Sequence, residues 1–125
     1  MEKGIEATKN NTGLVLNIAL SYSGKWDILQ ATKKLSQMVV NGEIKEDELD
    51  EAIFEKQLST YPAPNVDLLI RTGGDQRISN YLLWQSAYAE LMFLDVLWPD
   101  FKKEHLLESV IAFQHRERRF GKTND

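Results

Sequence analysis

The stretch Val66-Asp67-Leu68-Leu69-Ile70-Arg71-Thr72-Gly73-Gly74-Asp75-Gln76-Arg77-Ile78-Ser79-Asn80 decides how this chain folds and where its chemistry lies. Its first five residues are mostly apolar, which predicts a buried strand over 66–70. The strand runs into an arginine, a Gly-Gly turn, a second arginine and a serine. Glycines let the backbone turn tightly and approach an anion, and guanidinium groups are forked, permanently charged donors. Arg71, Arg77 and Ser79 are therefore predicted to hold a phosphate or pyrophosphate, although this motif alone fits a loop with solvated arginines equally well.

The overall composition is that of one modest soluble domain. The chain has 125 residues, of which 42% are hydrophobic and 27% charged, and its net charge of -4 gives no attraction to nucleic acid. It has no cysteine and two histidines, which excludes disulfides, thiolate metal sites and histidine-rich clusters. No apolar run approaches membrane-spanning length and no signal peptide is visible, so we expect a cytoplasmic protein with at most peripheral membrane contact.

Strand-like and helix-like patterns alternate along the chain. The apolar run 14–20 predicts a buried parallel strand, and 90–94 predicts a third strand after 66–70. Apolar residues at helical spacing predict a helix that begins near Trp26 and ends at Asn41-Gly42. This alternation indicates an α/β fold with a mostly parallel sheet flanked by helices. Three strands are few for a free-standing sheet of this kind, which indicates that the chain is part of something larger.

Further helices are expected around these strands. Asp47 is a candidate N-cap for a helix that runs to about Leu58, and a short helix is expected over 81–86. The last helix is predicted to begin after Asp100 and to stop at Gly121. One side of it is apolar, through Leu106, Leu107, Val110, Ile111 and Phe113.

Ordered blocks over nearly the whole chain resemble the cis-prenyltransferase family. One Arg-Thr-Gly-Gly motif would be weak evidence, but the blocks follow one another in the family's order, which a chance match does not explain. The blocks are residues 16–19 with 22–24, 67–74, 77–80, 82–85, 89–91, 98–101 and 116–121.

The resemblance implies an enzyme that condenses isopentenyl pyrophosphate onto an allylic pyrophosphate such as farnesyl pyrophosphate. The new double bonds are cis, magnesium (Mg2+) is the cofactor, and the product resembles the lipid carrier of cell-wall synthesis. The family fold is a parallel sheet with helices around an apolar tunnel, and the enzyme is a homodimer.

The resemblance also implies roles for single residues. Carried over by position, Arg71, Arg77 and Ser79 would bind the pyrophosphate of isopentenyl pyrophosphate, and Glu90 would be linked to magnesium and to the dimer interface. Arg119 and Gly121 match a terminal motif that would reach across the dimer toward the partner's pyrophosphate site. The basic cluster around Arg119 could equally be a solvated helix end, and Glu90 an ordinary charge before a strand.

The chain also departs from the family pattern. The block that carries the family's catalytic aspartate, Asp-Gly-Asn-Gly-Arg-Trp, is absent, so no catalytic residue is assigned. Residues 1–125 are expected to form a single partial domain, the C-terminal half of the family fold, and the isolated chain is predicted to be inactive. Asp75 stands where the family usually has glutamate. For Asp75 and Asn80, turn capping is as good an interpretation as catalysis.

Two other classes of function stay open. The chain could be a non-catalytic partner subunit of a heteromeric cis-prenyltransferase. It could also be an unrelated phosphate-binding module, although it has neither a Gly-rich loop followed by lysine and Ser/Thr nor a Gly-x-Ser-x-Gly motif.

Overall fold

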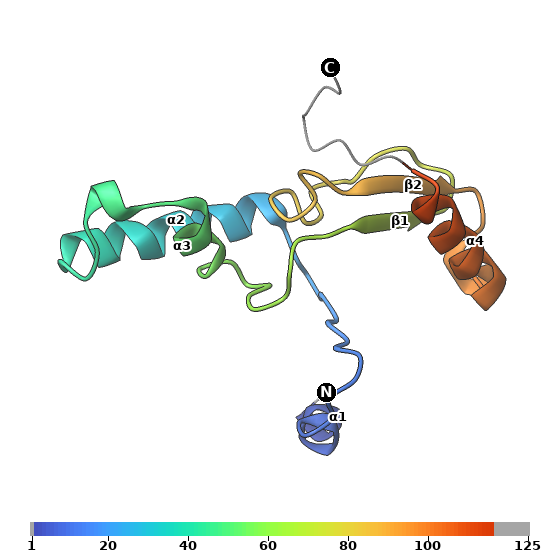
Figure 1. Ribbon diagram of the computed structural model, residues 1–125, viewed down its shortest axis with the longest axis horizontal. Helices are drawn as coiled ribbons and strands as arrows, with labels where there is room; N and C mark the ends of the chain where they lie inside the picture. Colours follow the sequence, from blue (N-terminus) through green and yellow to red (C-terminus); the bar gives the residue numbers. More distant parts are fainter. Residues whose placement is uncertain (1, 117–125) are drawn as a thin grey trace.

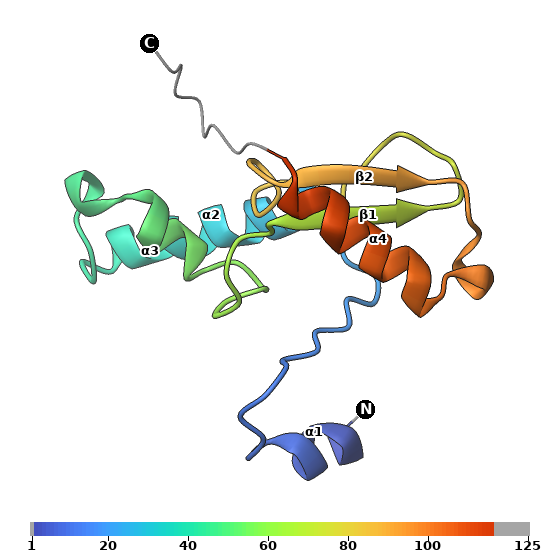
Figure 2. The same cartoon turned by 45° about the vertical axis from the view of Figure 1, so that its right-hand side comes forward.

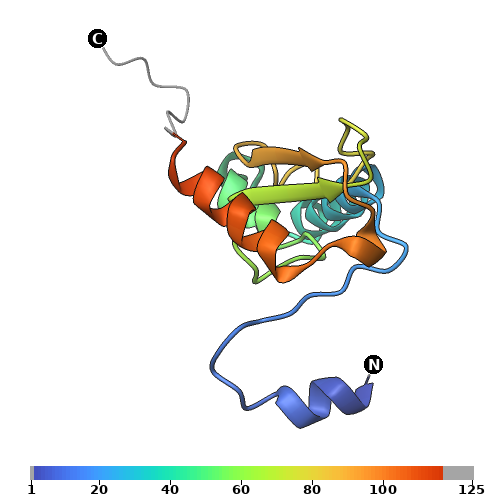
Figure 3. The same ribbon diagram turned by 90° about the vertical axis from the view of Figure 1, so that its right-hand side faces the viewer.

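The computed structural model describes residues 2–116 and places most of its helices and strands in two groups, with the first helix apart from both (Figure 1). The elements are α1 (Glu2–Thr8), α2 (Gly24–Val40), the 3-10 helix η1 (Glu46–Glu48), α3 (Glu51–Glu55), β1 (Leu68–Thr72), β2 (Glu90–Leu94), the 3-10 helix η2 (Trp98–Asp100) and α4 (Lys103–Gln114). Helices α2 and α3 lie side by side, whereas β1, β2 and α4 form the other group, with α4 running across one face of the strands (Figures 2 and 3). Within residues 2–116, no helix combines the length and apolar character needed to cross a bilayer.

The described part of the chain has one sheet, formed by two parallel strands. Strand β1 pairs with β2 in a register that runs from Leu68 opposite Glu90 to Thr72 opposite Leu94. The predicted strand 90–94 is confirmed, and so is the parallel arrangement. The first strand lies two residues later than the predicted 66–70, because strand ends follow the hydrogen-bonded partner rather than the apolar run. Arg71 therefore lies inside the strand.

The run 14–20 is not a strand, and the prediction of a buried parallel strand there is wrong for the described residues. The segment is an extended, unpaired thread between α1 and α2 (Figure 1). Its apolar side chains are exposed, Leu14 to 93% and Leu20 to 69%. A strand needs a neighbour for its N–H and C=O groups, and nothing in residues 2–116 pairs with this segment.

Helix α2 follows its sequence prediction closely. Ser23 is the N-cap, with an Oγ that accepts from Trp26 N at 3.3 Å, and the helix ends at Asn41. Gly42 then takes a φ of +71, as expected of a glycine after a helix end. The helix turns one side toward α3, where the described core is small: its buried side chains here are Ala31, Leu35 and Leu58.

The remaining helices differ from the predictions at both ends. The helix expected from an Asp47 N-cap to about Leu58 is the shorter α3. Its N-cap is Asp50, whose Oδ1 accepts from Ile53 N at 2.8 Å, and it ends at Glu55, while Asp47 lies in η1. The last helix begins after Lys102, since Asp100 belongs to η2, and it ends at Gln114. The helix therefore ends before the predicted stop at Gly121, which itself lies outside the described residues.

The helix expected over 81–86 is a series of turns. Ser79, Asn80 and Leu82 have φ angles of 47, 64 and 46 degrees, which belong to the left-handed region. A right-handed helix cannot begin through such residues. This segment therefore connects two parallel strands without a regular crossover helix, and it turns back toward α2 (Figure 1).

Candidate functional site

The guanidinium of Arg71 is held by the loop that follows β1. Its Nη1 donates to Ser79 Oγ at 2.7 Å and to the carbonyl oxygen of Arg77. Its Nη2 donates to Asp75 Oδ2 at 2.8 Å. Arg71 lies at the carboxyl end of a parallel strand, which is where α/β sheets usually bind ligands. The loop thus folds back over the arginine that precedes it.

Arg77 joins the same cluster through Asp75. Its Nη2 contacts Asp75 Oδ2 at 2.6 Å, so one carboxylate oxygen takes a donor from each arginine. The Arg77 side chain is 65% exposed, whereas that of Arg71 is 25% exposed. The structure thus brings Arg71, Arg77 and Ser79 together as the sequence predicts. Two cations beside one carboxylate leave a net positive cluster that opens to solvent through Arg77.

The two glycines turn the chain but do not offer their amides to a ligand. Gly73 and Gly74 have φ angles of 91 and 78 degrees, which glycine adopts without strain. Their N–H groups donate to the carbonyl oxygens of Val96 and Leu94, both at 2.9 Å. The glycines make the tight turn that the sequence predicts. Neither amide is free to bind an anion, because each already donates to a backbone carbonyl oxygen.

Asn80 ties the loop to α2. Its backbone oxygen accepts from Gly24 N at 2.8 Å, its Oδ1 accepts from Lys25 N at 2.9 Å, and its Nδ2 donates to Ser23 Oγ at 2.8 Å. Of the two interpretations left open for Asn80, the structure shows a cap, but the cap belongs to a helix more than fifty residues earlier in the chain. A pattern within one segment could not have found this partner.

A buried polar network lies beside this contact, and it was missed in the sequence. Asp27 is 2% exposed and accepts from Tyr22 OH at 3.0 Å and from Ser59 N at 2.9 Å. Gln85 adds an Nε2 contact to the same carboxylate at 3.5 Å and a hydrogen bond to Thr60 Oγ1 at 3.0 Å. Burial, followed by the hydrogen bond to Asp27, raises the pKa of Tyr22 to about 12. The sequence signal available was one acidic residue on the apolar side of α2.

Glu90 lies away from the arginine cluster. It is the first residue of β2, opposite Leu68, so it is at the end of the sheet where β1 begins. Its Oε2 accepts from Arg116 Nη1 at 2.6 Å. No group of three His, Cys, Asp or Glu residues that could hold a metal occurs among residues 2–116. This arrangement does not fit a magnesium site made by the described residues alone, and the metal role of Glu90 stays a prediction.

The other predicted residues need only brief placement. Arg119 and Gly121 lie outside the described residues. His115 is exposed and follows α4, while the Nδ1 of His105 accepts from Lys102 N at 2.9 Å and caps the start of that helix. Both histidines therefore have ordinary structural positions, as expected.

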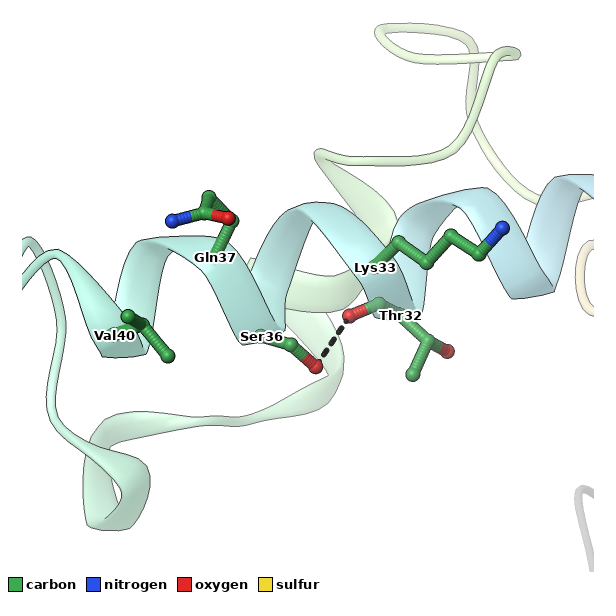
Figure 4. A pocket seen from close by; sticks show the side chains of 5 residues that line it. All are labelled: Thr32, Lys33, Ser36, Gln37 and Val40. Carbon is green, nitrogen blue, oxygen red and sulfur yellow. Dashed lines mark hydrogen bonds between the residues drawn. The ribbon is translucent and has the colours of Figure 1, made fainter.

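Two of the clefts that the described residues form lie apart from the arginine cluster. One, of about 340 Å³, lies on the exposed side of α2 and is lined by Thr32, Lys33, Ser36, Gln37 and Val40 (Figure 4). Within it, Ser36 Oγ donates to the Thr32 carbonyl oxygen at 3.0 Å. The other, of about 300 Å³, lies beside α3, and Gln85 lines it. The arginine cluster lies at the surface, since the side chains of Arg77 and Asp75 are both largely exposed.

Comparison with known proteins gives a consistent result. Residues 1–121 match the prenyltransferase family described as "Putative undecaprenyl diphosphate synthase". A ditrans,polycis-undecaprenyl-diphosphate synthase ((2E,6E)-farnesyl-diphosphate specific) of Pasteurella multocida is 58% identical over 114 residues, which are 91% of this chain and 48% of that protein. An isoprenyl transferase of Chlorobaculum tepidum is 50% identical over 125 residues, which are 100% of this chain and 47% of that protein.

Solved structures agree with these relatives. The lavandulyl diphosphate synthase of Lavandula x intermedia, solved in complex with dimethylallyl diphosphate, is 36% identical with a TM-score of 0.93. The match covers 97% of this chain and 52% of that one. A probable undecaprenyl diphosphate synthase of Campylobacter jejuni gives a TM-score of 0.77 at 36% identity, over 94% of this chain and 52% of that one. The chain spans about half the length of the curated relatives it matches.

Proposed function

The chain belongs to the prenyltransferase family of undecaprenyl diphosphate synthases, and on this premise we propose that it forms the isopentenyl-pyrophosphate-binding half of such an enzyme. The observation that supports the proposal is a cluster at the carboxyl end of β1, where Arg71 of the strand meets Arg77 and Ser79 of the loop that follows it. The sequence motif identifies the three residues, and the fold brings their side chains together.

The proposed task of these side chains is to bind and orient. Guanidinium groups match the oxygens of a pyrophosphate in both charge and shape, and the Ser79 hydroxyl adds a neutral donor. Arg77, as the more exposed of the two arginines, would meet the anion first, and Arg71 would hold it beside the strand end. Their contribution to the reaction is orientation and charge matching at the acceptor substrate.

The rest of the proposed reaction depends on parts that this chain does not supply. Its 125 residues contain no Asp-Gly-Asn-Gly-Arg-Trp block, so we propose that the catalytic aspartate comes from a matching N-terminal half and that the isolated chain is inactive. The whole enzyme would be a cytoplasmic homodimer that uses an allylic pyrophosphate, with magnesium, to make a lipid carrier for cell-wall synthesis. Arg119 and Gly121 would contact the partner's site.

A chimera tests the proposal directly. The residues of the Pasteurella multocida relative that match this chain are replaced by this chain, and elongation of farnesyl pyrophosphate with labelled isopentenyl pyrophosphate is measured. We expect the chimera to be active and the 125-residue chain to be inactive by itself. Robust elongation by the chain alone, or a folded but inactive chimera, would contradict the proposal.

A substitution in the chimera tests the site. Arg77→Ala removes a charge-assisted contact, and we expect the KM for isopentenyl pyrophosphate to rise by at least about tenfold. Lys33→Ala, a change at an exposed cation on α2, is the control and should leave that KM unchanged. An unchanged KM in Arg77→Ala would remove Arg77 from the site.

If the chain instead stimulates a separate catalytic subunit without forming an active chimera, the non-catalytic partner subunit is the better function. The absence of the aspartate block is the observation that keeps this second function open.

A further inference from the structure

We propose that Asn80 is a positioning residue: it fastens the loop that carries Arg77 and Ser79 to the start of α2, and so sets where the donors of the anion site lie. The inference rests on the proposed function, because it concerns the same site. It assigns Asn80 no contact with the substrate.

Asn80 makes three hydrogen bonds to the residues at the start of α2. At the start of a helix the first amides have no partner within the helix. The amides of Gly24 and Lys25 are both satisfied by Asn80, one by its carbonyl oxygen at 2.8 Å and the other by its side chain at 2.9 Å. The third contact runs from its Nδ2 to Ser23, whose Oγ also accepts from Trp26 N. The loop therefore docks on a helix end through three hydrogen bonds.

The loop and the first residue of α2 also pack closely against each other. Gly24 is buried, and a Cβ there would lie 2.8 Å from the Leu83 side chain and 3.0 Å from the Asn80 carbonyl oxygen. Such distances leave no room for a side chain, so only glycine lets the loop approach this closely. Figures 1 and 2 both show the segment after β1 returning to the N-terminal end of α2.

The backbone of the loop has an uncommon conformation next to the anion site. Ser79 and Asn80 both have left-handed φ angles, 47 and 64 degrees. Asparagine adopts this region more readily than most residues, whereas serine there is strained. Strained residues persist where their surroundings hold them in place. The hydrogen bonds of Asn80 are such a restraint, and Ser79 is one peptide bond away.

This restraint reaches the anion site through the guanidinium of Arg71. Ser79 Oγ and the Arg77 carbonyl oxygen both accept from Nη1 of Arg71. If Asn80 were released from α2, both acceptors would move and the guanidinium would lose the groups that orient it. A displacement of about 1 Å is enough to impair a site built on orientation. Asn80 thus acts on the anion indirectly, through Ser79 and the backbone of Arg77, which orient Arg71.

The experiment measures the dissociation constant for inorganic pyrophosphate by isothermal titration calorimetry, using the whole 125-residue chain. Asn80→Gly removes the side-chain contacts but accepts the left-handed φ, so we expect the Kd to rise about tenfold. Gly24→Ala pushes the Asn80 carbonyl oxygen away without removing any donor of the site, and should also raise the Kd.

Asn41→Ala is the matched control. Asn41 is the same residue type at the other end of α2, where its side chain accepts from Gln37 and donates to Glu43, both at 2.8 Å. We expect this variant to lower the melting temperature of the chain without changing the Kd. If Asn80→Gly behaves like Asn41→Ala, with a lower melting temperature and an unchanged Kd, the role of Asn80 is only structural and the inference is wrong.

A second background separates the inference from the function on which it rests. With Arg71→Ala already present, Asn80→Gly should weaken pyrophosphate binding much less than it does in the wild type, because Ser79 then has no guanidinium to orient. An equal loss in both backgrounds would contradict the inference. If the wild type does not bind pyrophosphate, the proposed function is wrong and the inference falls with it.

Discussion

At the scale of single residues, Asp75 is the most informative position in the cluster. One of its carboxylate oxygens contacts a guanidinium nitrogen from each arginine, at 2.8 and 2.6 Å. Arg71 keeps two further acceptors in the same loop, whereas the Arg77 side chain has no other hydrogen bond among the described residues. Asp75 therefore serves mainly to hold Arg77 near Arg71, a role that sequence reasoning left open.

This contact leads to a prediction. Asp75→Ala should raise the Kd for pyrophosphate by about two- to fivefold, the range expected when partly exposed ion pairs are lost. Asp75→Glu should restore most of the affinity, because the longer side chain keeps the charge and can still reach both arginines. The measurement is the same calorimetric titration. Equal or tighter binding by Asp75→Ala would mean that the carboxylate competes with the anion rather than holding Arg77.

At the scale of elements, the segment 14–20 and α2 show the difference between an apolar pattern and its environment. Both have the apolar content of core elements. Helix α2 buries Ala31 and Leu35 against neighbouring structure, whereas 14–20 remains extended and exposed. A helix satisfies its own backbone, but a strand does so only through a partner. The apolar run is therefore compatible with a strand that the described residues do not complete.

The exposed segment predicts that the isolated chain self-associates. Contiguous apolar surface of this kind favours association. Sedimentation velocity should show species larger than 14.4 kDa that become less abundant when Leu16 and Ile18 are replaced by serine. Replacing Thr32 and Gln37, which are exposed and polar, by serine is the control and should have no effect. A monomeric wild-type chain at all concentrations would contradict this prediction.

At the scale of the whole molecule, the buried network around Asp27 joins distant parts of the chain. It connects Tyr22 before α2, the Ser59 amide after α3 and Gln85 in the segment before β2. A buried carboxylate is costly unless it is hydrogen-bonded, so these contacts have to form together. The network therefore couples the helical pair to the loop that returns from the sheet.

Alkaline pH tests this coupling. The pKa of Tyr22 is raised from 10.0 to about 12 in the folded chain, so folding favours the protonated phenol. The stabilisation is fully present below the unfolded-state pKa of 10.0 and is lost as the pH rises through about 12. Urea unfolding should show the free energy of unfolding of the wild type falling more steeply over this range than that of Tyr22→Phe. Parallel curves for the two proteins would show that Tyr22 titrates normally.

The sequence by itself determined the local features of this protein. The spacing of apolar residues located α2, the run 90–94 located β2, and the motif at the end of β1 placed Arg71, Arg77 and Ser79 in one cluster. Those three residues lie within nine positions of one another, so a single turn is enough to bring them together.

Only the tertiary structure decided the features that join distant segments. The cap that Asn80 provides for α2, the surroundings of Asp27 and the ion pair between Glu90 and Arg116 each connect residues far apart in sequence. The exposure of 14–20 was likewise not foreseen. A sequence pattern indicates which side of an element is apolar. The hydrogen-bond partners of distant residues depend on the path of the whole chain, which a short stretch of sequence does not reveal.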